Sequence, residues 1–259
     1  MMMAILMMVA VSVSAQKSKA EPYFSFRELP NMLKWCPAPP DTVGAAFAYD
    51  IMQYMWGKQM RQNKERAEIA IRDATYSLEC IMQEFSEPLG LKMSEEETPE
   101  IYKLLKDSKA TCENISNFPK FYYKRIRPFM RFHEHTATPQ FEPDLRRNFS
   151  YPSGHTILGW CSALLLSEIN PERADTILTR GMMYGESRVI VGAHWQSDVD
   201  AGRLAAAAVY ARMHTSERFL EQMKLARQEF RIKTGLATTE EIKAFRKAVE
   251  KRAKANKKK

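Results

Sequence analysis

The stretch Ser-Arg-Val-Ile-Val-Gly-Ala-His-Trp-Gln-Ser-Asp, residues Ser187–Asp198, holds the polar side chains around which the chain is organised. If a helix begins at His194, positions i and i+4 share a face, so the carboxylate of Asp198 reaches the imidazole of His194. A carboxylate on one ring nitrogen fixes the tautomer and leaves the other nitrogen free to attack. The alternative is a buried strand, Val189–Val191, that runs into a helix capped by these two residues. This stretch alone does not separate the two interpretations.

Two earlier segments carry groups that bind anions. Tyr151-Pro152-Ser153-Gly154-His155 precedes an apolar stretch, Thr156–Leu166, with the pattern of a buried helix. Ser153 is a good N-cap for that helix, and Gly154 leaves room for an anion at its positive end. The other segment contains Lys120 and Arg127-Pro128, and by itself it is typical of an ordinary basic helix end.

Together the three segments resemble the acid-phosphatase and vanadium-haloperoxidase superfamily, whose pattern is K-x6-RP, then PSGH, then SR-x5-H-x3-D. Every defined position matches: Lys120, Arg127, Pro128, Pro152, Ser153, Gly154, His155, Ser187, Arg188, His194 and Asp198. The flanking sequence is closer still to the bacterial class A non-specific acid phosphatases, from Cys36-Pro37-Ala38-Pro39-Pro40 to about Lys233. This closer resemblance includes Arg-Ile-Arg-Pro at 125–128, Ser-Tyr-Pro-Ser-Gly-His at 150–155 and His-Trp-Gln-Ser-Asp-Val-Asp at 194–200.

The resemblance implies metal-independent hydrolysis of phosphate monoesters at acid pH, with a broad substrate range and no cofactor. His194 is then the nucleophile that forms a phosphohistidine, and Asp198 orients it. His155 protonates the departing oxygen and afterwards activates water. The implied phosphate-binding groups are Lys120, Arg127, Ser153, Gly154 and Arg188. A metal is not expected, because this cationic cluster supplies the charge that Mg²⁺ would otherwise supply.

Three other functions fit parts of the sequence. A vanadate-dependent haloperoxidase would use the same cluster, but such chains are usually much longer and lack the class A flanking sequence. A membrane lipid-phosphate phosphatase shares the motif but needs several spanning helices. A non-catalytic surface-binding protein would leave the complete set of catalytic residues unexplained. The expected partners are therefore small phosphomonoesters rather than nucleic acid, and a homo-oligomer is left open.

The remaining sequence predicts an all-α fold in one domain, and the resemblance implies a single compact helical domain of the type 2 phosphatidic acid phosphatase kind. Apolar residues at helical spacing predict helices at Phe47–Gln62 and Lys64–Phe85. Thr98-Pro99 starts another helix, and Asn170-Pro171 starts one that runs through Met183. Ser197–Met213 is a further helix. The predicted divisions are residues 1–15, 16–40 (an extended segment), 41–235 (the phosphatase domain) and 236–259 (a basic helix and tail).

The two ends of the chain carry separate signals. Met1–Val13 is apolar and uncharged and is followed by Ser14-Ala15, which predicts a signal peptide cleaved after Ala15 and a periplasmic or secreted protein. No Lys or Arg precedes this run, so an uncleaved anchor is the minority alternative. The run is shorter than the ~20 apolar residues of a spanning helix.

The formal net charge of +8 is concentrated at the C-terminus. Lys243–Lys259 contains nine Lys or Arg and one Glu, which gives +8 and leaves the rest of the chain balanced. This location argues against nucleic-acid binding. A last helix is expected to start at Thr238/Thr239, and the closing Lys-Lys-Lys is expected to be frayed. One interpretation of the basic segment is a solvated tail, and the other is loose binding to an anionic surface.

Two other groups of residues remain undecided. The four cysteines, Cys36, Cys80, Cys112 and Cys161, allow three full disulfide pairings, and nothing in the sequence selects one. Residues 133–144 form a polar loop that joins two of the motif segments and could border the pocket. Its His133 and His135 are better explained as an exposed pair than as metal ligands.

Overall fold

The computed structural model describes residues 19–256, and within that range the chain is helical with no strand, which confirms the all-α prediction. Three 3₁₀ turns, η1 to η3, interrupt the loops at Met32–Lys34, Pro139–Phe141 and Pro171–Arg173. The α-helices are α1 (Ala45–Met60), α2 (Lys64–Arg72), α3 (Leu78–Leu89), α4 (Pro99–Tyr123), α5 (Pro128–Arg131), α6 (Glu142–Arg147), α7 (Gly154–Ile169), α8 (Ala174–Ile190), α9 (Gln196–Met213), α10 (Glu217–Lys233) and α11 (Thr239–Asn256).

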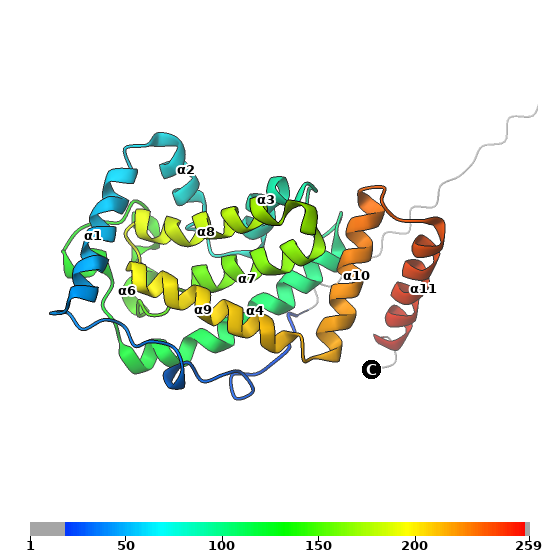
Figure 1. Ribbon diagram of the computed structural model, residues 1–259, viewed down its shortest axis with the longest axis horizontal. Helices are drawn as coiled ribbons and strands as arrows, with labels where there is room; N and C mark the ends of the chain where they lie inside the picture. The colour runs from blue at the N-terminus through cyan, green and yellow to red at the C-terminus, as the bar shows by residue number, and fades with distance from the viewer. Residues whose placement is uncertain (1–18, 257–259) are drawn as a thin grey trace, which may run out of the picture.

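Helix α7 lies at the centre of the fold because it is apolar on nearly all sides. It packs against α8, α9 and α4, and Figure 1 shows these four helices running alongside one another. Helix α10 crosses one end of this group with α11 beyond it, while α1 and α2 lie at the other end. The packing of α7 against α8 is close: a Cβ on Gly159 would lie 2.3 Å from the ring of Tyr184. The apolar sequence after His155 therefore becomes the core helix, and its first turn is free to face a cavity.

The prediction of one helix over Lys64–Phe85 is wrong, because the chain breaks at Asp73–Ser77 into α2 and α3. The side chain of Asp73 is buried and accepts hydrogen bonds from Arg180 and Ser187. Ser77 then caps α3 by accepting a hydrogen bond from the backbone N–H of Cys80, at 3.0 Å. Long-range polar contacts and a local cap thus override a continuous apolar periodicity.

Helix α8 corrects two expectations. It begins at Ala174, after the η3 turn, and runs to Ile190 rather than ending near Met183. Val189 and Ile190 are its last residues, so the strand alternative for Val189–Val191 is wrong. The helix ends because Gly192 adopts φ = +83°, a conformation that suits glycine, and the chain turns toward His194.

The other predicted helix starts are close to the observed ones. Helix α4 begins at Pro99, and the helix predicted from Ser197 begins at Gln196. The last helix begins at Thr239 as expected, but it is not a wholly solvated tail. Its Arg252 donates hydrogen bonds to the buried carboxylate of Glu100 and to Gln222. This docking ties α11 to the first turn of α4.

Several predictions concern residues outside the described range. The signal peptide at Met1–Ala15 and the closing lysines at 257–259 lie there, so the structure does not test them. Within the described range, all four cysteines are free thiols, and Cys36, Cys112 and Cys161 are buried. No helix between residues 19 and 256 is both long enough and apolar enough to cross a membrane.

Candidate active site

A cavity of about 430 Å³ opens where α4, α6, α7 and the turn before α9 meet. Its lining includes the predicted residues Lys120, Arg127, Gly154, His155 and His194. The remaining lining residues are Tyr76, Glu113, Ser116, Asn117, Asp144, Leu145 and Asn148. Three motif segments that are far apart in the sequence therefore meet at one cavity.

His194 contacts a cation on one side of its ring and a carboxylate on the other. Nε2 lies 2.9 Å from Nη1 of Arg127, and Nδ1 lies 3.3 Å from Oδ2 of Asp198. Because a guanidinium can only donate hydrogen bonds, Nε2 must be the acceptor in the first contact. In the neutral ring the proton is therefore on Nδ1, which faces Asp198, and the lone pair is on Nε2.

Asp198 is fully buried and its two oxygens have different partners. Oδ2 accepts hydrogen bonds from the hydroxyl of Ser150 and from the backbone N–H of Trp195, the latter at 2.9 Å. Oδ1 accepts one from Nη1 of Arg125 at 2.6 Å. Since α9 starts at Gln196, the contact with His194 is not one between neighbours on a helix face, as the sequence suggested. It arises because Asp198 points back from the first turn of α9.

Lys120 and Arg127 are held in place by backbone carbonyls. Nζ of Lys120 donates to the carbonyl oxygens of Phe149 and Pro152, at 2.9 and 2.7 Å. Nη1 of Arg127 donates to the carbonyl oxygen of Ala193 at 2.9 Å. Burial lowers the pKa of both groups below their usual ranges, and repulsion adds to this effect, from Arg127 on Lys120 and from Arg188 on Arg127. An anion in the cavity would oppose that repulsion.

Arg188 is buried and does not line the cavity, but its charge lowers the pKa of both His155 and His194. Its Nε and Nη1 are buried and have no hydrogen-bond partner among residues 19–256. Burial also lowers its pKa to about 10. A buried cation without a partner is costly, so these donors favour a bound anion beside Lys120 and Arg127.

The start of α7 provides open space at the positive end of a helix. Ser153 is the N-cap, and its oxygen accepts hydrogen bonds from the N–H and the hydroxyl of Thr156, at 3.3 and 2.9 Å. A Cβ built on Gly154 would meet no heavy atom within 4 Å. The absence of a side chain at Gly154 therefore leaves room for a ligand at the helix terminus.

His155 follows in the first turn of α7 and is held by the break between α2 and α3. Its Nε2 lies 3.1 Å from the carbonyl oxygen of Ala74, and its ring lies edge-on to Tyr76, with centroids 4.8 Å apart. Burial lowers the pKa of His155 well below its usual value, and the charge of Arg188 adds to this effect. The pKa of His194 is lowered in the same way, by burial and then by Arg127 and Lys120.

Some residues singled out in the sequence lie elsewhere. The hydroxyl of Ser187 donates to Asp73 and accepts from Arg66, so it joins α8 to α2 rather than facing the cavity. His133 and His135 are exposed and do not line the cavity, although Asp144 in the same segment does. Among residues 19–256, no group of three or more His, Cys, Asp or Glu side chains is arranged to hold a metal ion.

Three residues contribute to the site although the sequence did not predict them there: Arg125, Ser150 and Tyr76. Arg125 and Ser150 lie in the segments 125–128 and 150–155, which resemble the class A acid phosphatases. Nothing in those segments indicates that both side chains contact Asp198. No sequence pattern indicated Tyr76, because one continuous helix was expected over Lys64–Phe85. The chain instead breaks between α2 and α3, which brings Tyr76 next to His155.

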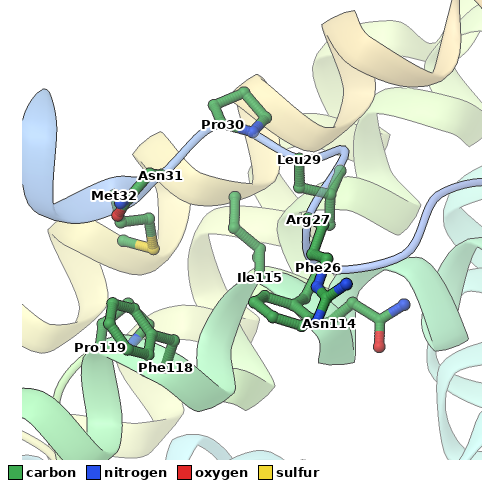
Figure 2. Close-up of a pocket in the computed structure, with 10 residues that line it drawn as sticks. All are labelled: Phe26, Arg27, Leu29, Pro30, Asn31, Met32, Asn114, Ile115, Phe118 and Pro119. Carbon is green, nitrogen blue, oxygen red and sulfur yellow. The ribbon is translucent and has the colours of Figure 1, made fainter.

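A second cavity, of about 240 Å³, lies between α4 and the segment before α1 (Figure 2). Figure 2 shows Phe26–Met32 on one side and Asn114, Ile115, Phe118 and Pro119 of α4 on the other. Arg27 is the one ionisable side chain in its lining. The larger cavity holds the clustered cations and histidines, so it is the candidate active site.

Known proteins with similar sequences match most of the chain. The PAP2 superfamily matches residues 108–220. A non-specific acid phosphatase of Providencia stuartii is 43% identical over 195 residues, which cover 75% of this chain and 78% of the relative. That of Salmonella typhimurium is 39% identical over 236 residues, covering 91% and 93%, and an acid phosphatase of Zymomonas mobilis is 32% identical over 218 residues, covering 84% and 82%. The chain therefore belongs to the non-specific acid phosphatases of the PAP2 superfamily.

Proposed function

We propose that this acid phosphatase hydrolyses phosphate monoesters through a phosphohistidine on Nε2 of His194, without a metal ion. The observation that carries the proposal is the 2.9 Å contact between Nε2 of His194 and Nη1 of Arg127. This contact supports the proposal because Arg127 can only donate, so the lone pair is on Nε2, beside a cation that we expect to bind phosphate. The nucleophile and the cradle for its target are thus adjacent.

In the first step, the phosphate oxygens bind Arg127, Lys120, Arg188 and the start of α7. Nε2 attacks phosphorus as the bond to the alcohol oxygen breaks. The ring becomes cationic, and the carboxylate of Asp198 stabilises the proton that stays on Nδ1. The arginines match pairs of phosphate oxygens better than lysine would, because each guanidinium presents a planar fork of donors.

His155 gives a proton to the departing alcohol oxygen in this step. In the second step, the neutral ring takes a proton from water, whose oxygen attacks phosphorus and displaces His194. The contact with Ala74 supports this role, because it holds the ring at the edge of the cavity. The proposed binding groups, Lys120, Arg127, Arg188 and the start of α7, contact the phosphate rather than the alcohol, which supports a broad range of leaving alcohols.

Metal independence rests on the charge of the cavity. Three buried cations, Lys120, Arg127 and Arg188, surround the phosphate position and supply the stabilisation that a divalent ion gives in other phosphoryl-transfer enzymes. Vanadate should inhibit strongly, because it adopts a five-coordinate geometry like that of the transferring phosphoryl group.

The test is phosphate release from a panel of alkyl and aryl monoesters in the presence of a chelator. We expect hydrolysis of most of the panel at undiminished rate. Loss of activity that Mg²⁺ or Zn²⁺ restores would overturn the metal-independent mechanism. A parallel assay of halide oxidation with peroxide and added vanadate distinguishes the haloperoxidase alternative, and we expect no oxidised halide.

Export is a separate proposal that rests on residues 1–15 alone. Their apolar run and the small residues Ser14-Ala15 predict removal of a signal peptide. Determining the N-terminus of the protein recovered from the periplasm or medium tests it. Gln16 is the expected first residue, and a chain that retains Met1 would contradict cleavage.

A further inference from the structure

Behind the candidate active site, one arginine lies between two buried carboxylates. Nη1 of Arg125 donates to Oδ1 of Asp198, and Nη2 donates to Oδ2 of Asp50, each at 2.6 Å. Asp50 and Asp198 are fully buried, and the side chain of Arg125 is only 9% exposed. The three residues come from α1, from the loop between α4 and α5, and from α9.

We propose that Arg125, held by Asp50, is a positioning residue that holds the carboxylate of Asp198 in the orientation in which Oδ2 faces Nδ1 of His194. The inference rests on the proposed role of His194 as the nucleophile. Arg125 does not touch the phosphate position, and it acts on the reaction only through Asp198.

The need for such a partner follows from the burial of Asp198. A carboxylate removed from water is costly unless a charge or several hydrogen bonds compensate it. Ser150 and the N–H of Trp195 supply hydrogen bonds to Oδ2, the oxygen that also faces His194. Arg125 supplies the one cation in ion-pair contact with Oδ1 among the described residues. Without it, Oδ1 would lose its ion pair and the carboxylate could rotate, so Oδ2 would no longer be held against Nδ1 of His194.

Asp50 restricts where the guanidinium of Arg125 can go. Its own oxygens accept hydrogen bonds from the N–H and the hydroxyl of Ser197, at 2.8 and 2.6 Å, so Asp50 is fixed to the first turn of α9. The guanidinium also lies over the ring of Trp195, 5.6 Å from its centroid. The two carboxylates and the ring of Trp195 hold the guanidinium of Arg125 in one orientation. Its planar fork of donors contacts Asp198 through Nη1 and Asp50 through Nη2.

Arg125→Gln is the main test variant. We expect its rate of phosphoenzyme formation to fall about 10- to 100-fold, as is usual when the group that orients a reactive histidine is lost. Its affinity for inorganic phosphate should stay close to that of the unaltered enzyme, because Lys120, Arg127 and Arg188 remain. Arg125→Lys should recover part of the rate, since it keeps the charge but loses the fork. Asp50→Asn should act in the same direction as Arg125→Gln, and the double variant should be less than additive.

The Nδ1–H signal of His194 gives a readout that a purely structural residue would not change, because this proton faces Asp198. In ¹⁵N-histidine-labelled enzyme, the signals of His194 are assigned by their loss in His194→Gln. We expect a protonated Nδ1 and an unprotonated Nε2 in both the unaltered enzyme and Arg125→Gln, because Arg127 can only donate to Nε2. In Arg125→Gln the hydrogen bond from Nδ1–H to Asp198 should weaken, which should shift the signal of that proton upfield. Arg131→Gln is the matched control: it removes a nearby arginine, one that lies over Phe47, and should leave both the rate and this signal unchanged.

Two results would overturn the inference. One is an Arg125→Gln enzyme with the original rate and the original Nδ1–H signal of His194. The other is an enzyme that loses phosphate binding and thermal stability together, with no rescue by lysine, which would make Arg125 a structural residue only. Failure of the proposed function is distinct from both. It would appear as an unaltered enzyme that turns over without ever carrying phosphate on His194.

Discussion

Nε2 of His155 lies 3.1 Å from the carbonyl oxygen of Ala74, in the break between α2 and α3. A carbonyl oxygen can only accept a hydrogen bond, so Nε2 carries a proton in both charge states of the ring. The nitrogen that gains and loses a proton is therefore Nδ1. The contact also favours the charged ring, and it opposes the effects of burial and of Arg188 on the pKa of His155.

The pH dependence of the reaction should follow from the two histidines. Burial and the neighbouring cations lower the pKa of His194 well below its usual value, so the nucleophile stays neutral into the acid range. The pKa of His155 is lowered too, so its acid form is lost as pH rises, although a bound phosphate anion partly restores it. We expect a bell-shaped profile of kcat/KM with its maximum on the acid side of neutrality. A rate that rises steadily through pH 9 would contradict the assignment.

The same shifts predict how stability changes with pH in the absence of phosphate. Because the folded-state pKa of each histidine is below its unfolded value of about 6.5, the unfolded chain binds more protons in the acid range. Their contribution to stability is therefore present above about pH 6.5 and is lost as pH falls. The Tm of the free enzyme should drop between pH 7 and 5, and added phosphate should reduce that drop.

Gly154→Ala should separate ligand binding from folding. The new methyl group would enter open space, so the free energy of unfolding should hardly change. It would occupy part of the cavity that the phosphate needs, and overpacking of this kind costs about 1–3 kcal/mol. Binding of inorganic phosphate, measured by calorimetry, should weaken by about 5- to 150-fold. Unaltered affinity would show that the phosphate does not approach the start of α7.

Ser187→Ala should show the reverse pattern. Its hydroxyl donates to the buried carboxylate of Asp73 at 2.6 Å and is outside the cavity lining. Its removal should lower the free energy of unfolding by about 1–3 kcal/mol, because a buried acceptor loses a partner. The value of kcat/KM should stay near that of the unaltered enzyme. A large loss of kcat with no change in denaturant midpoint would place Ser187 in the catalytic machinery.

How far the sequence could predict this protein depended on the range of the interactions involved. The residues of the candidate active site were predictable as a group because they lie in three short segments with fixed spacings. The apolar run after His155 likewise predicted a buried helix. The break at Asp73–Ser77 was not predictable, since it depends on Arg180 and Ser187, more than 100 residues away. The roles of Arg125 and Asp50 could not be predicted for the same reason. The contacts of Arg125 join residues that are far apart in the sequence and meet only when the helices pack.

The C-terminal helix gave a different outcome from the one expected of a basic tail. Deleting residues 243–259 removes Arg252, the ion-pair partner of Glu100, which would then keep only the hydrogen bond from Gln222 to its carboxylate. We expect the free energy of unfolding to fall by about 1–3 kcal/mol, with little change in kcat, because the cavity is formed by other helices. Arg252→Gln should reproduce most of that loss, whereas Lys254→Gln should not. Equal stability of the truncated and full-length chains in denaturant would show that the Arg252 contact contributes nothing.

The phosphohistidine mechanism is tested most directly by rapid-quench labelling of the His155→Ala enzyme with an aryl phosphate. An acidic phenol leaves without protonation, so His194 should still be phosphorylated, while attack of water lacks its base. The result expected is a burst of phenol equal to the enzyme present, slow turnover afterwards, and acid-labile phosphate on the peptide that contains His194. His194→Ala should show no label, and an alkyl phosphate should give His155→Ala no burst. Equal slowing of alkyl and aryl esters, with no burst and no label on His194, would contradict the mechanism.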